Sequence, residues 1–338
     1  MSDVQPFAAR PALIGLDWGT TAMRAYLFDA LGNVLATRAS SDGIMRLPQP
    51  GGFEAAFEAA CGDWLESSPN LPVIAAGMVG SAQGWREAPY VDTPADASAL
   101  VAGIVRVTTG RGVALHIVPG VIERGDLPNV MRGEETQIVG ALASAAIGGE
   151  VRSLVGLPGT HAKWAVVRGE RIESFHTFMT GELYSALREH TILGRTMIEP
   201  PAPDTQAFLR GVTVAKHAHR AGLLATIFST RTLGLTGALG AQQQPDYLSG
   251  LLIGHELCGL AALLESRGAA LAGEAPRLIG SAALCERYRL ALTEFGCLRA
   301  HIVHAAAESG LWRIATQAAL VPSSAAAVGA SERAETKR

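Results

Sequence analysis

The pattern of apolar and polar positions near the start of the chain predicts an antiparallel meander. An apolar run at residues 12–16 ends at Asp17, and a second apolar strand follows at 22–28. The Gly32-Asn33 pair is a hairpin signal, so residues 34–37 are predicted to form a third strand. The polar and glycine residues of the first turn are Asp17, Gly19, Thr20 and Thr21.

A second meander with the same pattern occurs in the middle of the chain. Residues 154–157 predict a strand, and a Pro-Gly-Thr-His turn and strands at 163–167 and 171–178 follow. Each meander has an apolar strand, a Gly-Thr turn, a basic residue and another apolar strand. Two interpretations remain open here. The similarity is either a coincidence between two hairpins, or the mark of two related domains whose turns face a shared cleft.

Other segments are predicted from periodicity and turn signals. The long C-terminal part is expected to be mainly helical, with one strand at 276–280. A loop is expected at 80–95. The remaining predicted elements are an amphipathic helix at 51–67, a buried strand at 71–80, a short strand at 115–119 and a helix at 133–146 with two glutamates in its first turn.

Length and composition favour a two-domain α/β protein. The chain has 338 residues, 48% of them hydrophobic, which suits two domains at residues 1–148 and 149–338. The net charge of −3 gives no general attraction to nucleic acid or to an anionic membrane. The four cysteines show no CxxC pair, and no signal peptide or membrane span is recognised. We therefore expect a cytoplasmic protein that binds neither nucleic acid nor membranes.

Turns of glycine and threonine suit a phosphate ligand. They present backbone N–H groups and hydroxyls without a bulky side chain in the way. The sequence has no GxxxxGK[ST] loop, and no GxGxxG follows a strand in the required context. A phosphate site built from two such turns is therefore favoured over a Walker or Rossmann site.

Three motifs resemble those of the actin/hexokinase-type ATPases. Asp17–Thr21 resembles their first phosphate motif, Leu157–His161 the second, and Leu278–Ala282 the adenosine motif. The adenosine motif departs from the usual pattern, because Ser281 stands where a second glycine is common. The resemblance implies two ribonuclease H-like α/β domains, each with a mixed sheet flanked by helices, and a cleft between them.

Longer segments resemble the 2-dehydro-3-deoxygalactonokinase family more closely. They are LDWGTTAMR (16–24), AGMVGSAQGW (76–85), VMRGEETQ (130–137), LPGTHAKW (157–164) and FMTGEL (178–183). The resemblance implies transfer of the γ-phosphoryl group of ATP to the C6 hydroxyl of 2-dehydro-3-deoxy-D-galactonate, with Mg²⁺ required. A kinase of another 2-keto-3-deoxy sugar acid is an alternative.

The resemblance also implies roles for the motif residues. Asp17 would act at Mg²⁺, although an aspartate there can simply cap the turn. His161 could equally be an ordinary polar turn residue. The expected ATP-binding residues are Gly19, Thr20, Thr21, Gly159, Thr160 and His161 for the phosphates and Gly280 and Ser281 for the adenosine.

The catalytic base is expected among the acidic residues of the 133–146 helix. Similarity to the Gly-x-Glu-Glu start of related phosphatases favours Glu135, with Glu134 next and Asp126 in reserve. The alternative is that both glutamates only satisfy the helix dipole. The expected substrate-binding residues are Arg24, Lys163, Arg132, Gly80, Ser81 and Trp85, with Arg86 a further cation and Trp85 equally suited to the core.

Two other functions remain open at this point. A polyphosphate- or pppGpp-type phosphatase shares the fold and the Gly-x-Glu-Glu feature, but does not usually carry LPGTHAKW. A non-catalytic sugar sensor on the same scaffold usually adds an N-terminal DNA-binding region, and the first strand begins too early for one here. The sequence leaves the oligomeric state open, with a homodimer among the options.

Overall fold

The computed structural model describes residues 10–48, 51–143 and 151–321, which form two compact units. Unit 1 contains the described residues up to Val151, Val167–Ser174 and the described residues from Ala305 on. Unit 2 contains Arg152–Val166 and Phe175–His304. The predicted boundary between residues 148 and 149 lies outside the described residues. The predicted division also did not include the return of the chain to unit 1 at Ala305.

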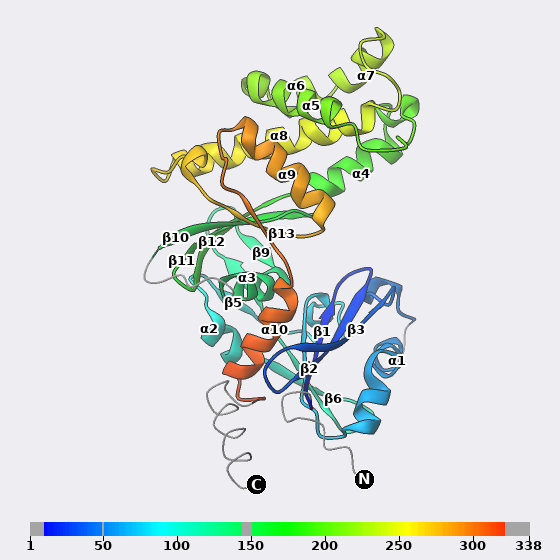
Figure 1. The fold of residues 1–338 in the computed structure, drawn as a ribbon, viewed down its shortest axis with the longest axis vertical. Coiled ribbons are helices and arrows are strands. Elements are labelled where there is room, and N and C mark those ends of the chain that lie inside the picture. Colours follow the sequence, from blue (N-terminus) through cyan, green and yellow to red (C-terminus); the bar gives the residue numbers. More distant parts are fainter. Residues whose placement is uncertain (1–9, 49–50, 144–150, 322–338) are drawn as a thin grey trace, which may run out of the picture. The chain divides into compact units, whose positions relative to one another are not determined.

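Unit 1 is built on a six-stranded mixed sheet in the order β3-β2-β1-β4-β7-β6 (Figure 1). β1 pairs antiparallel with β2 and parallel with β4, and β4 pairs parallel with β7. The strands are β1 (Pro11–Trp18), β2 (Met23–Asp29), β3 (Val34–Ser40), β4 (Val73–Ala76), β6 (Val105–Thr108) and β7 (Ala114–Ile117). The predicted first meander is therefore confirmed.

The two faces of β1 have different partners, because successive side chains of a strand point in opposite directions. Leu16 and Trp18 are buried in the apolar core between the sheet and helix α1 (Gly52–Ser67). Gly15 lies on the other face, where a Cβ would come within 3.2 Å of Leu311 on helix α10 (Ala306–Gln317). Asp17 follows Gly15 on that second face, which places a carboxylate at the end of the strand on the side of α10.

Unit 1 also contains a three-stranded sheet in the order β5-β8-β9 and two further helices. β5 falls in a segment that was predicted to be a loop, so that prediction was wrong in part. These elements are β5 (Tyr90–Asp92), β8 (Gly120–Glu123), β9 (Asn129–Met131), α2 (Ala97–Ala102) and α3 (Glu134–Ala143).

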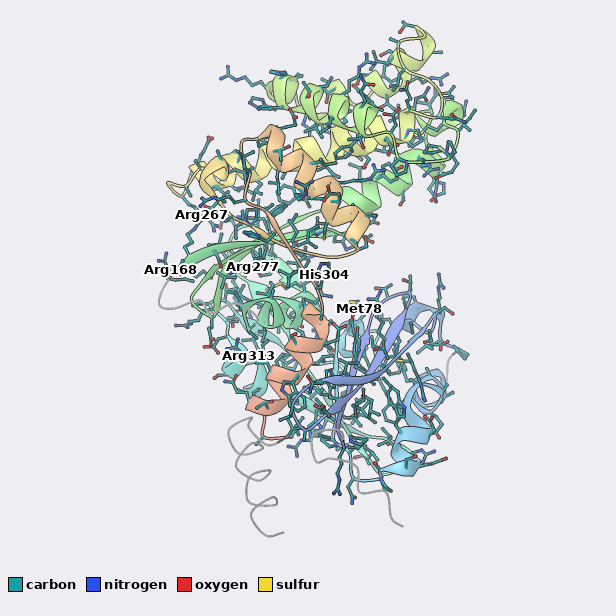
Figure 2. All side chains as sticks on the ribbon, in the orientation of Figure 1. Met78, Arg168, Arg267, Arg277, His304 and Arg313 are labelled. Carbon is teal, nitrogen blue, oxygen red and sulfur yellow. The ribbon has the colours of Figure 1, made fainter. Side chains whose placement is uncertain are left out.

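The backbones of helices α3 and α10 pack directly against each other at two glycines. A Cβ on Gly140 would lie 1.9 Å from the Ala306 carbonyl oxygen, and one on Gly310 would lie 1.9 Å from the Thr136 carbonyl oxygen. Only glycine permits this backbone approach. Arg313 of α10, labelled in Figure 2, also pairs with Glu170 at 2.5 Å within the same unit. The C-terminal helix is thus an integral part of unit 1.

The second sheet has the order β12-β11-β10-β13-β14, with β13 parallel to both β10 and β14. Residues 167–174, at the ends of β11 and β12, belong to unit 1. The second meander and the strand near residue 278 are confirmed, whereas β14 contradicts the prediction of a single strand in the C-terminal part. The strands are β10 (Arg152–Leu157), β11 (Ala162–Arg168), β12 (Arg171–Phe178), β13 (Arg277–Ile279) and β14 (His301–Val303).

The order β12-β11-β10-β13-β14 repeats the order β3-β2-β1-β4-β7 of the first sheet. In each, three consecutive strands are followed by strands parallel to the first of them. This is the ribonuclease H-like order of the actin/hexokinase-like fold, which confirms the predicted fold class. It also favours two related domains over a coincidence between hairpins. The predicted cleft between the domains stays a prediction.

The helices of unit 2 pack around α8, which is apolar and long enough to cross a membrane. Most of α8 is buried, and its Gly250 lies against the Phe208 carbonyl of α5, so α8 is a core helix of the unit. The helices are α4 (Thr180–His190), α5 (Thr205–Ala218), α6 (Leu223–Thr226), α7 (Ser229–Leu235), α8 (Gln244–Glu265) and α9 (Ala282–Glu294).

Candidate active site

The predicted first phosphate turn, residues 19–22, is held in place by the segment after β3. The Gly19 amide donates to the Ala22 carbonyl at 2.9 Å, which closes the turn. Ile44 donates to the Gly19 carbonyl at 3.0 Å and Met45 to the Thr20 carbonyl at 3.1 Å. Thr20 and Thr21 stay exposed. The backbone of the turn is therefore held, while its hydroxyls are available to a ligand.

Asp17 stands beside this turn in a partly buried position. Its cross-strand partner is Arg24, whose Nη1 lies 4.0 Å from Asp17 Oδ2. Burial raises the pKa of the Asp17 carboxyl above its ordinary value. The Arg24 guanidinium lowers this pKa, and the negative charges of Glu308 and Glu134 raise it further. Asp17 is therefore close enough to Glu134 for that charge to affect its pKa.

Two glycines bring the ends of β1, β4 and β9 together. Gly77 follows β4 with φ of +96°, and a Cβ there would lie 2.8 Å from the Trp18 carbonyl oxygen. Gly133 precedes α3 with φ of +106°, and its Cβ would lie 3.2 Å from Gly77 Cα. Both positions need glycine for conformation and for space. Met78, labelled in Figure 2, begins the short 3₁₀ turn that follows Gly77.

The two glutamates of α3 have different surroundings. Glu135 is completely buried, and its Oε2 accepts the Gly133 amide at 2.7 Å while its Oε1 accepts the Thr136 hydroxyl at 3.1 Å. Burial raises the pKa of Glu135 to about 8, and the charge of Glu134 contributes to the increase. Glu134 is half-buried, and its Oε2 accepts the Arg132 amide at 3.0 Å. Glu134 is therefore the one of the pair that a ligand can reach.

The pKa of Glu135 predicts how stability depends on pH. The folded state keeps the proton up to about pH 8, whereas the unfolded state releases it near the ordinary value of 4.5. Stability should therefore fall as pH rises through this window, by up to about 1.4 kcal/mol per pH unit from this group. Glu135→Gln removes the titration, so the variant should lose less stability than the wild type between pH 5 and 8. Urea unfolding at several pH values measures this, and parallel curves for the two proteins would contradict it.

The predicted substrate residues Gly80, Ser81 and Arg132 lie together. A Cβ on Gly80 would be 3.1 Å from Arg132 Nη1. Ser81 and Arg132 are both buried. Trp85, in contrast, packs against Trp18, Phe53 and Phe57 with ring centroids 5.8–6.0 Å apart. Of the two roles open for Trp85, the structure therefore favours the core.

The predicted second phosphate turn, in unit 2, is held by the start of α4. The Glu182 amide donates to the Thr160 carbonyl at 3.0 Å, and a Cβ on Gly181 would lie 2.5 Å from the Gly159 carbonyl oxygen. His161 contacts the Glu182 carboxylate. Buried Lys163 donates from Nζ to the His161 carbonyl at 2.9 Å, so its ammonium group helps to fix the turn.

The predicted adenosine motif lies next to this turn, because β10 and β13 are parallel neighbours. A Cβ on Gly280 would lie 3.2 Å from the Pro158 carbonyl oxygen, and the Ser281 hydroxyl caps α9 by accepting the Leu284 amide at 3.4 Å. A cavity of about 270 Å³ opens beside Gly159 in the same unit. Its other lining residues include Tyr184, Leu252, Ile253, Leu284 and Arg287.

A buried carboxylate links α8 to three other elements of unit 2. Glu256 of α8 accepts hydrogen bonds from Trp164 Nε1 of β11 and Tyr288 Oη of α9, each at 2.7 Å, and from the Thr180 hydroxyl. Burial raises the pKa of Glu256, and the three donors oppose this. Because Thr180 and Tyr288 both line the cavity, this network fixes the cavity wall. A lone glutamate in an apolar helix was the sequence signal for it.

Known proteins resemble this chain over most of its length. The family described as 2-keto-3-deoxy-galactonokinase matches residues 17–314. This chain belongs to the 2-keto-3-deoxy-galactonokinase family. The 2-dehydro-3-deoxygalactonokinase of Escherichia coli (strain K12) is 34% identical over 285 residues, which cover 84% of this chain and 90% of that protein.

Two further relatives come from rhizobia. A Rhizobium meliloti (strain 1021) protein assigned as a 2-dehydro-3-deoxygalactonokinase is 37% identical over 290 residues, covering 83% of this chain and 89% of that protein. A crystal structure of a Sinorhizobium meliloti protein assigned the same activity shares 34% identity with a TM-score of 0.81. It covers 92% of this chain and 100% of that one. Membership in the 2-keto-3-deoxy-galactonokinase family supports a sugar-acid kinase over a phosphatase or a sensor.

The sequence motifs of the 2-keto-3-deoxy-galactonokinase family thus separate into two local groups, one in each unit. In unit 1 the structure brings together Asp17, the 19–22 turn, Gly80, Ser81, Arg132 and Glu134. In unit 2 it brings together Gly159–His161 and Gly280. The reserve base Asp126 lies exposed between β8 and β9, and Arg86 is exposed. Thr180 and Gly181 of the cavity fall within the FMTGEL segment, but sequence reasoning missed its other lining residues on α4, α8 and α9, which lie outside the quoted motifs.

Proposed function

We propose that this protein is a cytoplasmic kinase that transfers the γ-phosphoryl group of ATP to the C6 hydroxyl of 2-dehydro-3-deoxy-D-galactonate. The products are the 6-phosphate and ADP. The observation that carries the proposal is the accessible Glu134 beside Asp17 and the 19–22 turn, in a chain that matches the family almost throughout. A kinase needs this combination of a carboxylate for the attacking hydroxyl and a cradle for phosphates.

In this proposal Glu134 is the catalytic base. The C6 oxygen attacks the γ-phosphorus, its proton passes to the Glu134 carboxylate, and the bond from phosphorus to the bridging oxygen breaks to release ADP. The Arg132 amide orients the glutamate through its bond to Oε2. The Glu135 carboxyl accepts the Gly133 amide and so holds the loop before α3, and its side chain is not exposed to a substrate.

The phosphates of ATP are assigned to the Gly-Thr turns. In unit 1, Thr20 and Thr21 offer exposed hydroxyls and Gly19 a braced backbone. In unit 2, the turn of Gly159, Thr160 and His161 offers one exposed hydroxyl, an exposed imidazole and a backbone held at the Thr160 carbonyl. We assign the adenine to the cavity beside Gly159, whose lining is largely apolar and whose size suits a small flat ring. Gly280 permits close approach at the edge of the second turn, and Ser281 sets the start of α9.

The residues present fit a magnesium ion held mainly by waters and phosphates. Among the described residues no group of three or more His, Cys, Asp or Glu side chains could hold a metal ion. Mg²⁺ commonly uses one or two carboxylates together with substrate phosphates and waters, which suits Asp17 at the turn. The ion would neutralise charge on the transferring phosphoryl group. Arg24, 4.0 Å from Asp17, would orient that carboxylate.

The proposal is tested by ADP release from Mg-ATP with a panel of acceptors. The panel contains 2-dehydro-3-deoxy-D-galactonate, its C4 epimer derived from gluconate, simple hexoses and no acceptor. We expect rapid ADP formation with the galactonate-derived acid and loss of activity when EDTA removes the metal. Equal rates with and without any acceptor would overturn the kinase assignment, and a faster reaction of the epimer would overturn the substrate assignment.

A further inference from the structure

We propose that Arg132 and Ser81 form the subsite that binds the carboxylate of the sugar acid. This subsite would make the enzyme select acids over neutral sugars. The inference rests on the proposed function, because it names the part of the substrate that one side of the unit 1 site recognises.

The first observation is a buried cation whose hydrogen-bonding capacity is largely unused. Arg132 is only 8% exposed, and its Nε and Nη1 are buried without a hydrogen-bond partner. Its Nη2 donates to the Ala88 carbonyl at 2.8 Å. Within the described ranges no carboxylate forms an ion pair with it. A buried guanidinium in this state is costly unless an anion pairs with it, so the site is suited to receive one.

The guanidinium is held in place by neutral groups. Its Cζ lies 4.3 Å from the centroid of the Tyr90 ring, which stacks against the cation. On another side Gly80 has no side chain, and a Cβ there would lie 3.1 Å from Nη1. The Ala88 amide donates to the Gly80 carbonyl at 2.9 Å, which ties these two contacts together. A cation fixed in this way loses little freedom when it binds a ligand.

Ser81 supplies a second, independent observation. Its hydroxyl is buried without a partner, and the residue is 6% exposed. It directly follows Gly80, the residue against which the Arg132 guanidinium lies. Buried hydroxyls are normally hydrogen-bonded. A carboxylate, which only accepts hydrogen bonds when ionised, would satisfy the hydroxyl and the guanidinium together.

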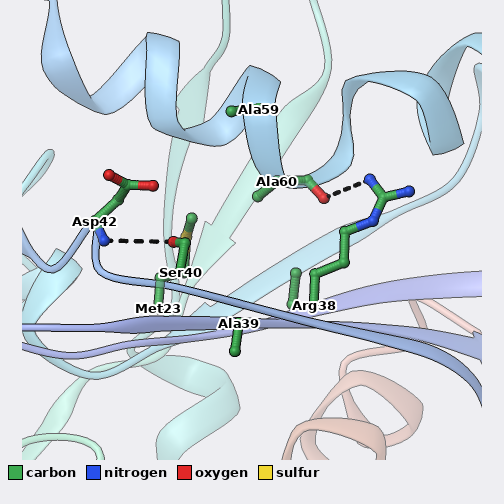
Figure 3. A pocket seen from close by; sticks show the side chains of 8 residues that line it. Met23, Arg38, Ala39, Ser40, Asp42, Ala59 and Ala60 are labelled. Carbon is green, nitrogen blue, oxygen red and sulfur yellow. Dashed lines mark hydrogen bonds between the residues drawn. The ribbon is translucent and has the colours of Figure 1, made fainter.

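Three other cations, predicted from the sequence or found beside a cavity, are exposed or already engaged. Arg38 borders a hollow between α1 and strands β2 and β3 (Figure 3), but it donates to the Ala60 carbonyl and pairs with Asp63 at 2.6 Å. Arg24 is exposed beside Asp17, and Lys163 donates to the His161 carbonyl. Arg132 therefore differs from these three in having buried donor atoms without a hydrogen-bond partner.

The position of Arg132 favours the sugar acid over the phosphates of ATP. Arg132 is two residues before Glu134, and its backbone amide holds the Glu134 carboxylate. Its side chain lies at the loop after β4, where Nη1 approaches Gly80. A substrate whose hydroxyl meets Glu134 can therefore place its carboxylate against Arg132 in the same orientation.

The test compares Arg132→Gln, Arg132→Lys and Ser81→Ala with the wild type. The substrates are 2-dehydro-3-deoxy-D-galactonate and its C1 amide. We expect Arg132→Gln to raise KM for the acid about 100-fold or more, with KM for ATP nearly unchanged and the preference for acid over amide lost. Arg132→Lys should recover part of the affinity, since it keeps the charge but not the planar donor set. Ser81→Ala should raise KM for the acid about tenfold without loss of folded protein.

Calorimetric titration of the acid without ATP separates this inference from the proposed function. If the wild type binds the acid through Arg132 but forms no ADP, the subsite holds and the kinase assignment fails. If the wild type is an active kinase and Arg132→Gln keeps its KM for the acid, the subsite is wrong. A rise in KM for ATP instead would assign Arg132 to phosphate and also overturn the inference. If Arg132→Gln does not fold, an unchanged KM in Ser81→Ala overturns it.

Discussion

Glu134→Gln should lower kcat for the sugar acid by about a hundred- to ten-thousand-fold, the usual contribution of a general base. Gln keeps the size of the side chain and an oxygen that can accept the Arg132 amide, so the loop should keep its shape. It cannot accept the proton of the attacking hydroxyl. KM for both substrates should therefore change much less than kcat. Steady-state kinetics with the acid and Mg-ATP measure this.

The matched control is Glu135→Gln, one residue further along α3. Glu135 is completely buried and contacts only its own loop among the bonds that the structure shows. Its substitution should alter stability and its pH dependence while kcat at neutral pH changes by less than about tenfold. If instead Glu135→Gln abolishes turnover and Glu134→Gln does not, the assignment of the base is reversed.

Gly310→Ala should destabilise the protein by about 3 kcal/mol or more, because overpacking against the backbone leaves no side chain that can move aside. The added methyl would lie 1.9 Å from the Thr136 carbonyl oxygen, so α10 and α3 would have to separate. Gly140→Ala should act similarly from the other helix, since its Cβ would meet the Ala306 carbonyl oxygen. Urea unfolding measures both effects.

A control for this effect is Gly273→Ala in unit 2. A Cβ on Gly273 would meet no atom within 4 Å, and the residue does not have a positive φ. The free energy of unfolding should then change by less than about 0.5 kcal/mol. Equal losses for Gly310→Ala and Gly273→Ala would mean that close packing of the two helices is not the cause.

Much of the fold followed from apolar periodicity and turn residues. The two meanders stood out because each strand is flanked by glycine-containing turns. β14 was missed because it is three residues long and its His301 is exposed, so it has neither the length nor the apolar character of a core strand. The inclusion of α10 in unit 1 could not be predicted, because it depends on contacts between distant glycines.

For the candidate site, the sequence indicated segments but not the orientation of each side chain. The preference for Glu135 came from similarity, although the helix period points the other way. Glu135 shares a face with the buried residues Ile138, Val139 and Leu142, at the i+3, i+4 and i+7 positions. Glu134 has half-buried Gln137 at i+3 but buried Ile138 and Ala141 at i+4 and i+7, so the helix period separates the two glutamates only in part. The state of Arg132 had no sequence signal, since burial without a partner is a property of the folded loop.

The return of the chain to unit 1 at Ala305 has a consequence for biosynthesis. During translation the ribosome completes the whole of unit 2 before it produces α10. Until then, the face of β1 that carries Gly15 and the glycine face of α3 stay uncovered. Domains that are continuous in sequence can fold in order as they emerge, but unit 1 has to wait for its final helix. Chains truncated just before Ala305 should therefore hold a folded unit 2 and an unfinished unit 1.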